Sequence, residues 1–169
     1  MKINEIKLLV NELVISRKQV EINRNNWLLQ TKPTLEAAFN YLKSNLSPTI
    51  ELNYYVDVFA QNLEAVVFSL GSEDSGITLE VEGNTFSYIK HYGHLVFGQL
   101  HNGEISVVIS LPYIEELVTN NEQEIIMDPL KPSELTEDKI LDVFHVFLTK
   151  IVEWENSLPP VAFKHAIYS

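Results

Sequence analysis

The five histidines are the side chains of this chain that could bind a metal ion or transfer a proton near neutral pH. His91 and His94 flank a predicted turn between strands, and a metal site there would need a third ligand from elsewhere in the chain. The next histidine, His101, lies seven residues further on, about 23 Å along an extended strand. We therefore predict no metal site and no bound cofactor, and we expect His91 and His94 to be exposed to water.

Asp142 and His145 are three residues apart on a predicted helix, a spacing at which a carboxylate can orient an imidazole for acid–base chemistry. Helical sites of this kind need a second matching motif, and the sequence holds none. We expect the pair to lie at the edge of the buried stripe of its helix. A functional role for this pair, or for His91 with His94, stays open at this point.

Other catalytic patterns are absent from the sequence. Neighbouring glutamates such as Glu115 and Glu116 could form a carboxylate pair, but a chain with 23 acidic residues has many such pairs, and most are solvated. The chain has no cysteine and no G-x-S-x-G nucleophile elbow. We predict no catalytic residue, which favours a protein that is not an enzyme.

Glycine and proline divide the chain into segments of different structure. All six glycines lie within residues 71–103, and all seven prolines lie outside residues 49–111. Glycine supplies tight turns, and proline cannot donate to a β-ladder. Residues 49–111 are therefore predicted to form an antiparallel meander of about six strands.

The N-terminal segment, residues 1–47, has apolar side chains at helical spacing. Residues 2–22 predict an amphipathic helix, three asparagines at 23, 25 and 26 predict its end, and a second helix is expected over about 34–46. The stripe of the first helix keeps a heptad spacing until Arg17 interrupts it. This helix either pairs in a coiled coil or packs on its own domain, and we favour the second arrangement.

Two hairpins are predicted within the meander. A turn at Gly83-Asn84 would pair Val81 with Phe86 and Leu79 with Tyr88. A turn at Asn102-Gly103 would pair Leu100 with Ile105, Val96 with Ile109 and Phe97 with Val108. The second hairpin is apolar on both faces, so we expect other elements or a partner to cover both.

The C-terminal third completes the predicted fold. Residues 112–135 read as an acidic connection, and Thr136 is expected to cap a long helix over 136–158. The fold class is α+β in a single domain over residues 1–169: two N-terminal helices, the meander, and the C-terminal helix packed on the sheet.

The charge of the chain limits its partners. The formal net charge is −11, while residues 1–32 carry six basic and three acidic side chains, a local charge of +3. The negative field disfavours nucleic acid and anionic membranes and favours a neutral or basic protein partner. The absence of cysteine and of an apolar membrane-spanning segment suggests a cytoplasmic location.

These features favour a small acidic protein-binding module, of the adaptor, secretion-chaperone or toxin-neutralising type. Aromatic residues on an acidic surface often anchor protein interfaces. The expected partner-binding residues are Tyr55, Phe59, Tyr92, Glu115 and Glu116. The alternative for Tyr55 and Phe59, which we favour, is that the N-terminal helices cover this face of the strand. The alternative is a small-molecule-binding domain with an apolar pocket between the sheet and the C-terminal helix. A homodimer is also possible, because the second hairpin is apolar on both faces. Separately, the charge asymmetry would let the N-terminal helix dock on the acidic surface of its own chain or of another copy.

Overall fold

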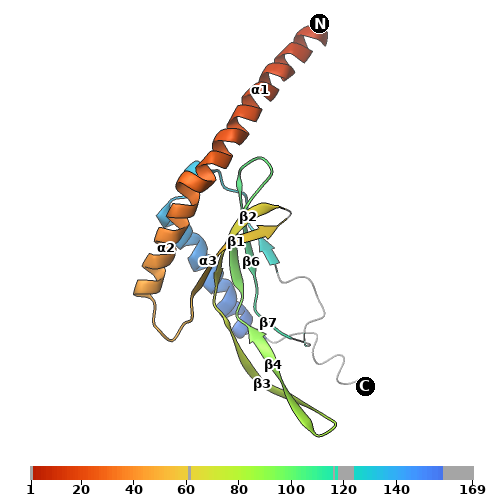
Figure 1. Cartoon of the computed structure of the whole chain (residues 1–169), viewed down its shortest axis with the longest axis vertical. Coiled ribbons are helices and arrows are strands. Elements are labelled where there is room, and N and C mark those ends of the chain that lie inside the picture. The colour runs from red at the N-terminus through yellow and green to blue at the C-terminus, as the bar shows by residue number, and fades with distance from the viewer. Residues whose placement is uncertain (1, 61, 116, 118–123, 158–169) are drawn as a thin grey trace.

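A continuous helical rod forms the N-terminal part of the structure, a computed structural model that describes residues 2–60, 62–115, 117 and 124–157. Helix α1 (Lys2–Asn26) runs through a π-helical segment, η1 (Trp27–Thr31), into α2 (Lys32–Asn45) (Figure 1). The predicted stop at the asparagines is therefore wrong. The N–H of Lys32 donates to the carbonyl of Trp27, five residues earlier. This wider turn lies just before Pro33, which has no N–H to donate, and π-bulges of this kind let a helix continue past such a residue.

Most of α1 projects away from the rest of the molecule (Figure 1). Residues 2–19 are all exposed. Contact with the rest of the molecule, which we call the body, begins at Val20. There the Asn23 side chain donates to the carbonyl of Asn102, and Arg24 donates to the carbonyl of His101. The expectation that this helix packs on its own domain is therefore wrong beyond its last two turns.

The strands form two antiparallel sheets rather than one six-stranded meander. The larger sheet has the order β1-β2-β5-β6-β8, and the smaller has the order β3-β4-β7. The bounds are β1 Asn53–Ala60, β2 Leu63–Ser69, β3 Ser72–Val81, β4 Asn84–His91, β5 His94–Gln99, β6 Ile105–Ser110, β7 Tyr113–Ile114 and β8 Glu124–Ile126. The two extra strands, β7 and β8, come from the segment that was predicted to be an acidic connection.

Helices α2 and α3 (Glu137–Glu155) pack together over one face of the larger sheet. Phe68, at the centre of this core, contacts the rings of Phe39 from α2 and Phe144 from α3. The predicted cap of the C-terminal helix is confirmed, because the Thr136 hydroxyl accepts from the N–H of Lys139 at 3.2 Å. A short 3-10 helix, η2 (Pro132–Glu134), precedes it. The α+β class and the packing of the C-terminal helix on the sheet are both as predicted.

The β5–β6 hairpin is one residue out of the predicted register. Phe97 pairs with Val107 instead of Val108. The loop has three residues, His101–Gly103, with Gly103 at φ 78°, and it is closed by Leu100 and Glu104. Such loops combine a turn with a glycine in the left-handed region, whereas the prediction assumed a two-residue turn. The correct register places all the large buried side chains on one face: Leu95, Phe97, Ile105, Val107 and Ile109.

The β3–β4 hairpin also turns one residue earlier than predicted. Val81 pairs with Asn84 and Leu79 with Phe86, so the two-residue turn is Glu82-Gly83. Both turn residues have positive φ, 51° and 80°, as a tight hairpin requires. The shift keeps the apolar side chains on the predicted common face but changes their partners.

No helix in the described part of the chain is long and apolar enough to cross a membrane.

Candidate functional site

The expected partner-binding residues do not form one surface. Tyr55 lies opposite Val67 and Phe59 opposite Glu64, so the two aromatic rings point to opposite faces of β1. The cause is a register shift between Tyr55 and Val58, where Asp57 has φ 60°. Both rings are exposed, 50% and 65%. The prediction placed them on one side because it assumed an unbroken alternation along the strand.

Glu115 and His91 lie where β4 meets β7, and His94 begins the neighbouring strand β5. Both histidines are partly buried, so the expectation that they are exposed to water is wrong. His91 forms a hydrogen bond with Glu115 at 2.9 Å, and its ring stacks on Tyr113 with 4.6 Å between centroids. Burial, and then the nearby His91, lower the pKa of His94. No cluster of three or more potential metal ligands occurs among the described residues. Glu116 lies outside the described residues.

Asp142 and His145 are both exposed on α3. The buried stripe of this helix passes between them, through Val143 and Phe144. This is the boundary position that the sequence predicts for the pair. Their exposure gives no enclosed site in which a carboxylate would tune the imidazole.

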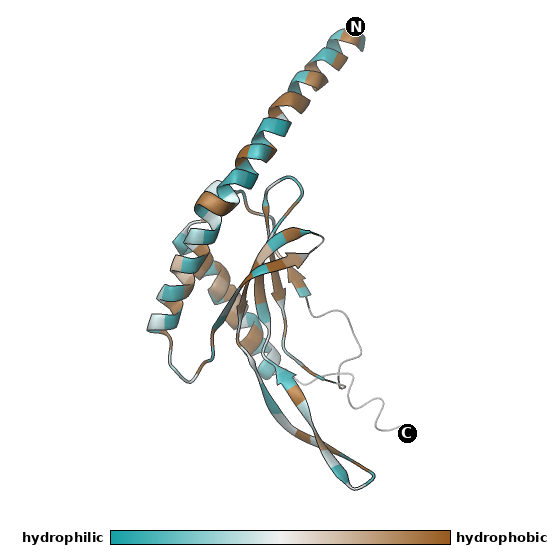
Figure 2. Ribbon diagram, in the orientation of Figure 1, coloured by the Kyte–Doolittle hydropathy of each residue, from teal (hydrophilic) through white to brown (hydrophobic). Residues whose placement is uncertain are grey.

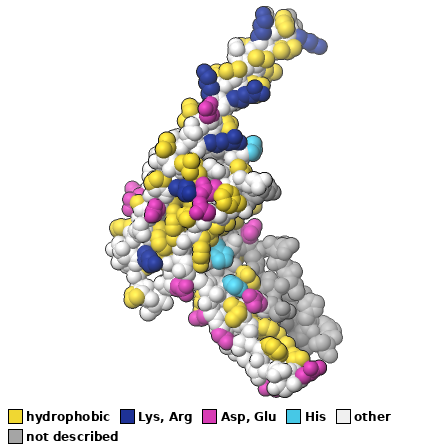
Figure 3. All heavy atoms as spheres, in the orientation of Figure 1, with side chains coloured by type: hydrophobic (Ala, Val, Ile, Leu, Met, Phe, Trp, Pro, Cys, Tyr) yellow, Lys and Arg dark blue, Asp and Glu magenta, His cyan; other side chains and the backbone are white. Residues whose placement is uncertain are grey.

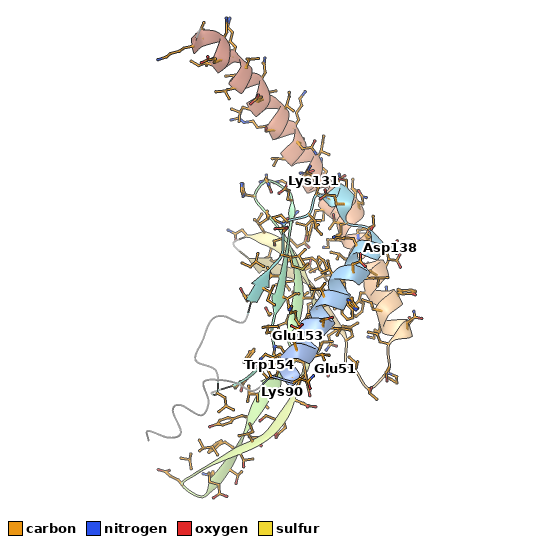
Figure 4. The ribbon with its side chains drawn as sticks, turned by 180° about the vertical axis from the view of Figure 1, so that it is seen from behind. Glu51, Lys90, Lys131, Asp138, Glu153 and Trp154 are labelled. Carbon is orange, nitrogen blue, oxygen red and sulfur yellow. The ribbon has the colours of Figure 1, made fainter. Side chains whose placement is uncertain are left out.

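A hollow of about 540 Å³ lies between the C-terminal half of α3 and the sheet. Lys90 is on its wall and pairs with Glu155 at 2.7 Å, with its ammonium over the rings of Tyr92 and Trp154. Figure 4 shows Lys90, Trp154 and Glu51 grouped around this end of α3. The lining combines apolar side chains with carboxylates: Ile50, Leu70, Leu148, Ile151 and Val152, with Glu51, Glu73 and Glu155.

Tyr92 is fixed at the edge of this hollow. Its hydroxyl donates to the carboxylate of Glu73, and this hydrogen bond, followed by burial, raises the pKa of Tyr92 to about 12. Lys90 and Tyr92 therefore already have partners within the chain. The hollow thus presents an apolar floor and an acidic rim.

A second candidate site consists of two arms that extend from the body at opposite ends (Figure 1). One is α1. The other is the β3–β4 hairpin, residues 72–91, which we call the ribbon. In the part of the chain that the structure describes, the ribbon has only two strands beyond its pairing with β7 at Lys90 and His91. Two-stranded ribbons are marginally stable in water, so an exposed one is a candidate for a docking element.

Hydrophobic residues recur along both arms, as the brown segments of Figure 2 show, and many of their side chains are exposed. On the ribbon, Leu79, Val81 and Phe86 share one face and are all exposed. On α1, the side chains of the predicted stripe are exposed instead of packed. That stripe includes Ile3, Ile6, Leu9, Val10, Leu13 and Val14.

Sequence reasoning missed a second, narrower stripe on α1. Leu8, Ile15 and Ile22 recur every seven residues, on the side of the helix opposite the predicted stripe, and all three are exposed. The regular spacing of seven was the signal for this stripe. A helix with apolar residues on opposite sides is less amphipathic than predicted.

The two arms have opposite charges. Helix α1 has five basic and three acidic side chains, a net charge of +2, whereas the ribbon has four acidic and one basic side chain, a net charge of −3. Figure 3 shows basic side chains along the projecting helix and acidic ones at the far end of the ribbon. Each arm thus combines an apolar face with a net charge, positive on α1 and negative on the ribbon.

Comparisons of the chain with protein-family models, with curated proteins and with solved structures found no match.

Proposed function

We propose that this chain is a protein-binding module whose docking elements are α1 and the ribbon. The observation that supports this most is the exposure of the apolar stripe of α1 over residues 2–19, before the helix reaches the described part of the body. Exposed apolar side chains in such a continuous row are costly in water and are typical of protein interfaces. The adaptor, secretion-chaperone and toxin-neutralising types all need such a surface.

The net charge of −11 supports a protein partner that is neutral or basic over one that is a nucleic acid or an anionic membrane. The absence of cysteine suits a reducing compartment, and we propose the cytoplasm as the place of action. In this proposal the helical core and the larger sheet serve as the scaffold that holds the two arms apart.

Photo-cross-linking in the native source tests this function. A photoreactive residue is placed at Leu9 on α1 or at Phe86 on the ribbon, and at Tyr41, exposed on α2, as a control. We expect the two arm positions to form adducts with a polypeptide and the control position to form far fewer. Adducts at Tyr41 only, or no polypeptide adduct at any position, would contradict the proposal.

The hollow beside α3 favours a second candidate function, the binding of a small molecule. Its volume of about 540 Å³ falls in the range of ligand pockets, and its lining is apolar with a few polar groups. Native mass spectrometry of the purified protein would detect a retained molecule. Val152→Trp, which fills the hollow from α3, should abolish that retention, whereas Val146→Trp on the same helix, outside the hollow, should not.

A further inference from the structure

From the two arms we infer that the partner of this chain is a second copy of itself, with α1 of each copy packed along the ribbon of the other. This inference rests on the proposed function, because it names the occupant of the same docking elements. It depends on four properties of the arms: their apolar faces, their charges, their lengths and their positions in the molecule.

Among the described residues, neither apolar face has a partner. The stripe of α1 and the face of the ribbon formed by Leu79, Val81 and Phe86 are exposed. A helix packed on a two-stranded ribbon is one of the ordinary ways to bury both elements, and it would give the ribbon the covering layer that it lacks.

The charges favour a contact between helix and ribbon over one between two helices. Each α1 carries +2 and each ribbon −3, so a helix–ribbon contact joins opposite charges. A coiled coil of two α1 helices would join like charges, and in the parallel register it would place Arg17 against its own counterpart in the seam. Helix pairing would also leave both ribbons bare.

The lengths and positions of the arms allow the contact to close. The 18 residues of α1 beyond the body, residues 2–19, extend about 27 Å, and the ten residues of β3 extend about 33 Å. The arms lie at opposite ends of the molecule in both Figure 1 and Figure 4. When two copies lie side by side in opposite directions, each α1 therefore lies beside the ribbon of the other copy. A two-fold axis relates the two contacts, so the assembly closes as a dimer and does not grow into a filament.

The mass in solution is the first test, by sedimentation across a range of protein concentrations. We expect a dimer whose dissociation constant rises with salt, because opposite charges contribute to the contact. A chain that stays monomeric at the highest concentrations overturns the inference. Polypeptide adducts at Leu9 or Phe86 in the native source would, in that case, still support the proposed function with a different partner.

A matched pair of substitutions tests the helix side. Leu8 and Leu9 are neighbours, and each is 64% exposed, but only Leu9 belongs to the stripe that faces the ribbon. We expect Leu9→Glu to raise the dissociation constant on the order of a hundredfold and Leu8→Glu to change it by less than about threefold. Equal effects of the two substitutions would contradict the assigned face.

Cysteine cross-linking distinguishes the helix–ribbon contact from helix pairing. The chain has no cysteine, so single ones can be introduced without background reaction. A copy with Leu13→Cys is mixed with a copy of different mass with Leu79→Cys, and a short thiol-reactive cross-linker is added. We expect adducts that join the two different copies. Adducts confined to pairs of Leu13→Cys copies would indicate a coiled coil and overturn the inference.

Discussion

At the scale of single residues, Glu64 links the helical rod to the sheet. Its carboxylate accepts hydrogen bonds from the indole N–H of Trp27, at 2.6 Å, and from the ammonium of Lys32. Burial raises the pKa of Glu64, but these two hydrogen bonds and the charge of Lys32 together hold it below its ordinary value of 4.5. The ionised form is therefore the one that the fold stabilises.

We expect Glu64→Gln to lower the free energy of unfolding by about 1–2 kcal/mol at pH 7, because the charged partner of Lys32 is lost. The folded pKa lies below the unfolded one, so the contribution of the carboxylate is present above pH 4.5. It decreases as the pH falls through the folded pKa. The difference in unfolding free energy between the wild-type protein and Glu64→Gln should therefore shrink on acidification, measured by urea unfolding with tryptophan fluorescence.

Glu12→Gln, exposed on α1, is the control. A difference that stays constant down to the acid transition would argue against the assigned contacts.

At the scale of elements, the direction of α1 depends on its contact with the loop His101–Gly103. A Cβ atom on Gly103 would lie 2.6 Å from the Cβ of Asn23 and 3.1 Å from the backbone N of Arg24. Gly83, at the end of the ribbon, has nearly the same φ, 80° against 78°, but no atom within 4 Å of its would-be Cβ. The two glycines therefore share the backbone strain of a substitution and differ in the steric clash.

We expect Gly83→Ala to cost about 1 kcal/mol of stability, from the left-handed conformation alone. Gly103→Ala should cost about 2–3 kcal/mol, because the new methyl group also displaces α1. Chemical denaturation of the two variants measures the difference. Equal costs would mean that the loop does not fix α1 in solution.

The elements also show how far the sequence could be interpreted. The separation of glycine from proline predicted the antiparallel strands, and Thr136 before Glu137 and Asp138 predicted the start of α3, because turn and cap preferences act within a few residues. The β5–β6 register was missed because Asn102-Gly103 suits both a two-residue and a three-residue turn, and the choice depends on packing of Phe97 and Val107 in the core. The predicted site residues Tyr55 and Phe59 lie on opposite faces of β1 because a bulge separates them, and no local sequence pattern predicts this bulge.

At the scale of the whole molecule, the exposure of the two arms could not be predicted from the sequence, and the reason is a different one. The stripe of α1 was recognised, but a stripe does not tell whether the covering layer belongs to the same chain. The structure places the core between α2, α3 and the larger sheet and leaves residues 2–19 outside it. In the proposed dimer, folding of the body and burial of the arms are therefore separate processes.

This separation predicts how stability depends on protein concentration. If the arms are buried only in the folded dimer that we propose, the melting temperature of the full chain should rise by about 2 °C for each tenfold increase in concentration. Removal of residues 1–18 should abolish this dependence. It should leave the melting temperature at the lowest concentrations nearly unchanged, because the removed side chains that the structure describes, residues 2–18, are exposed in the single copy. Scanning calorimetry over a hundredfold range of concentration measures both effects. A truncated chain that melts far lower even at high dilution would show instead that α1 stabilises its own body, since dilution removes the contribution of a second copy.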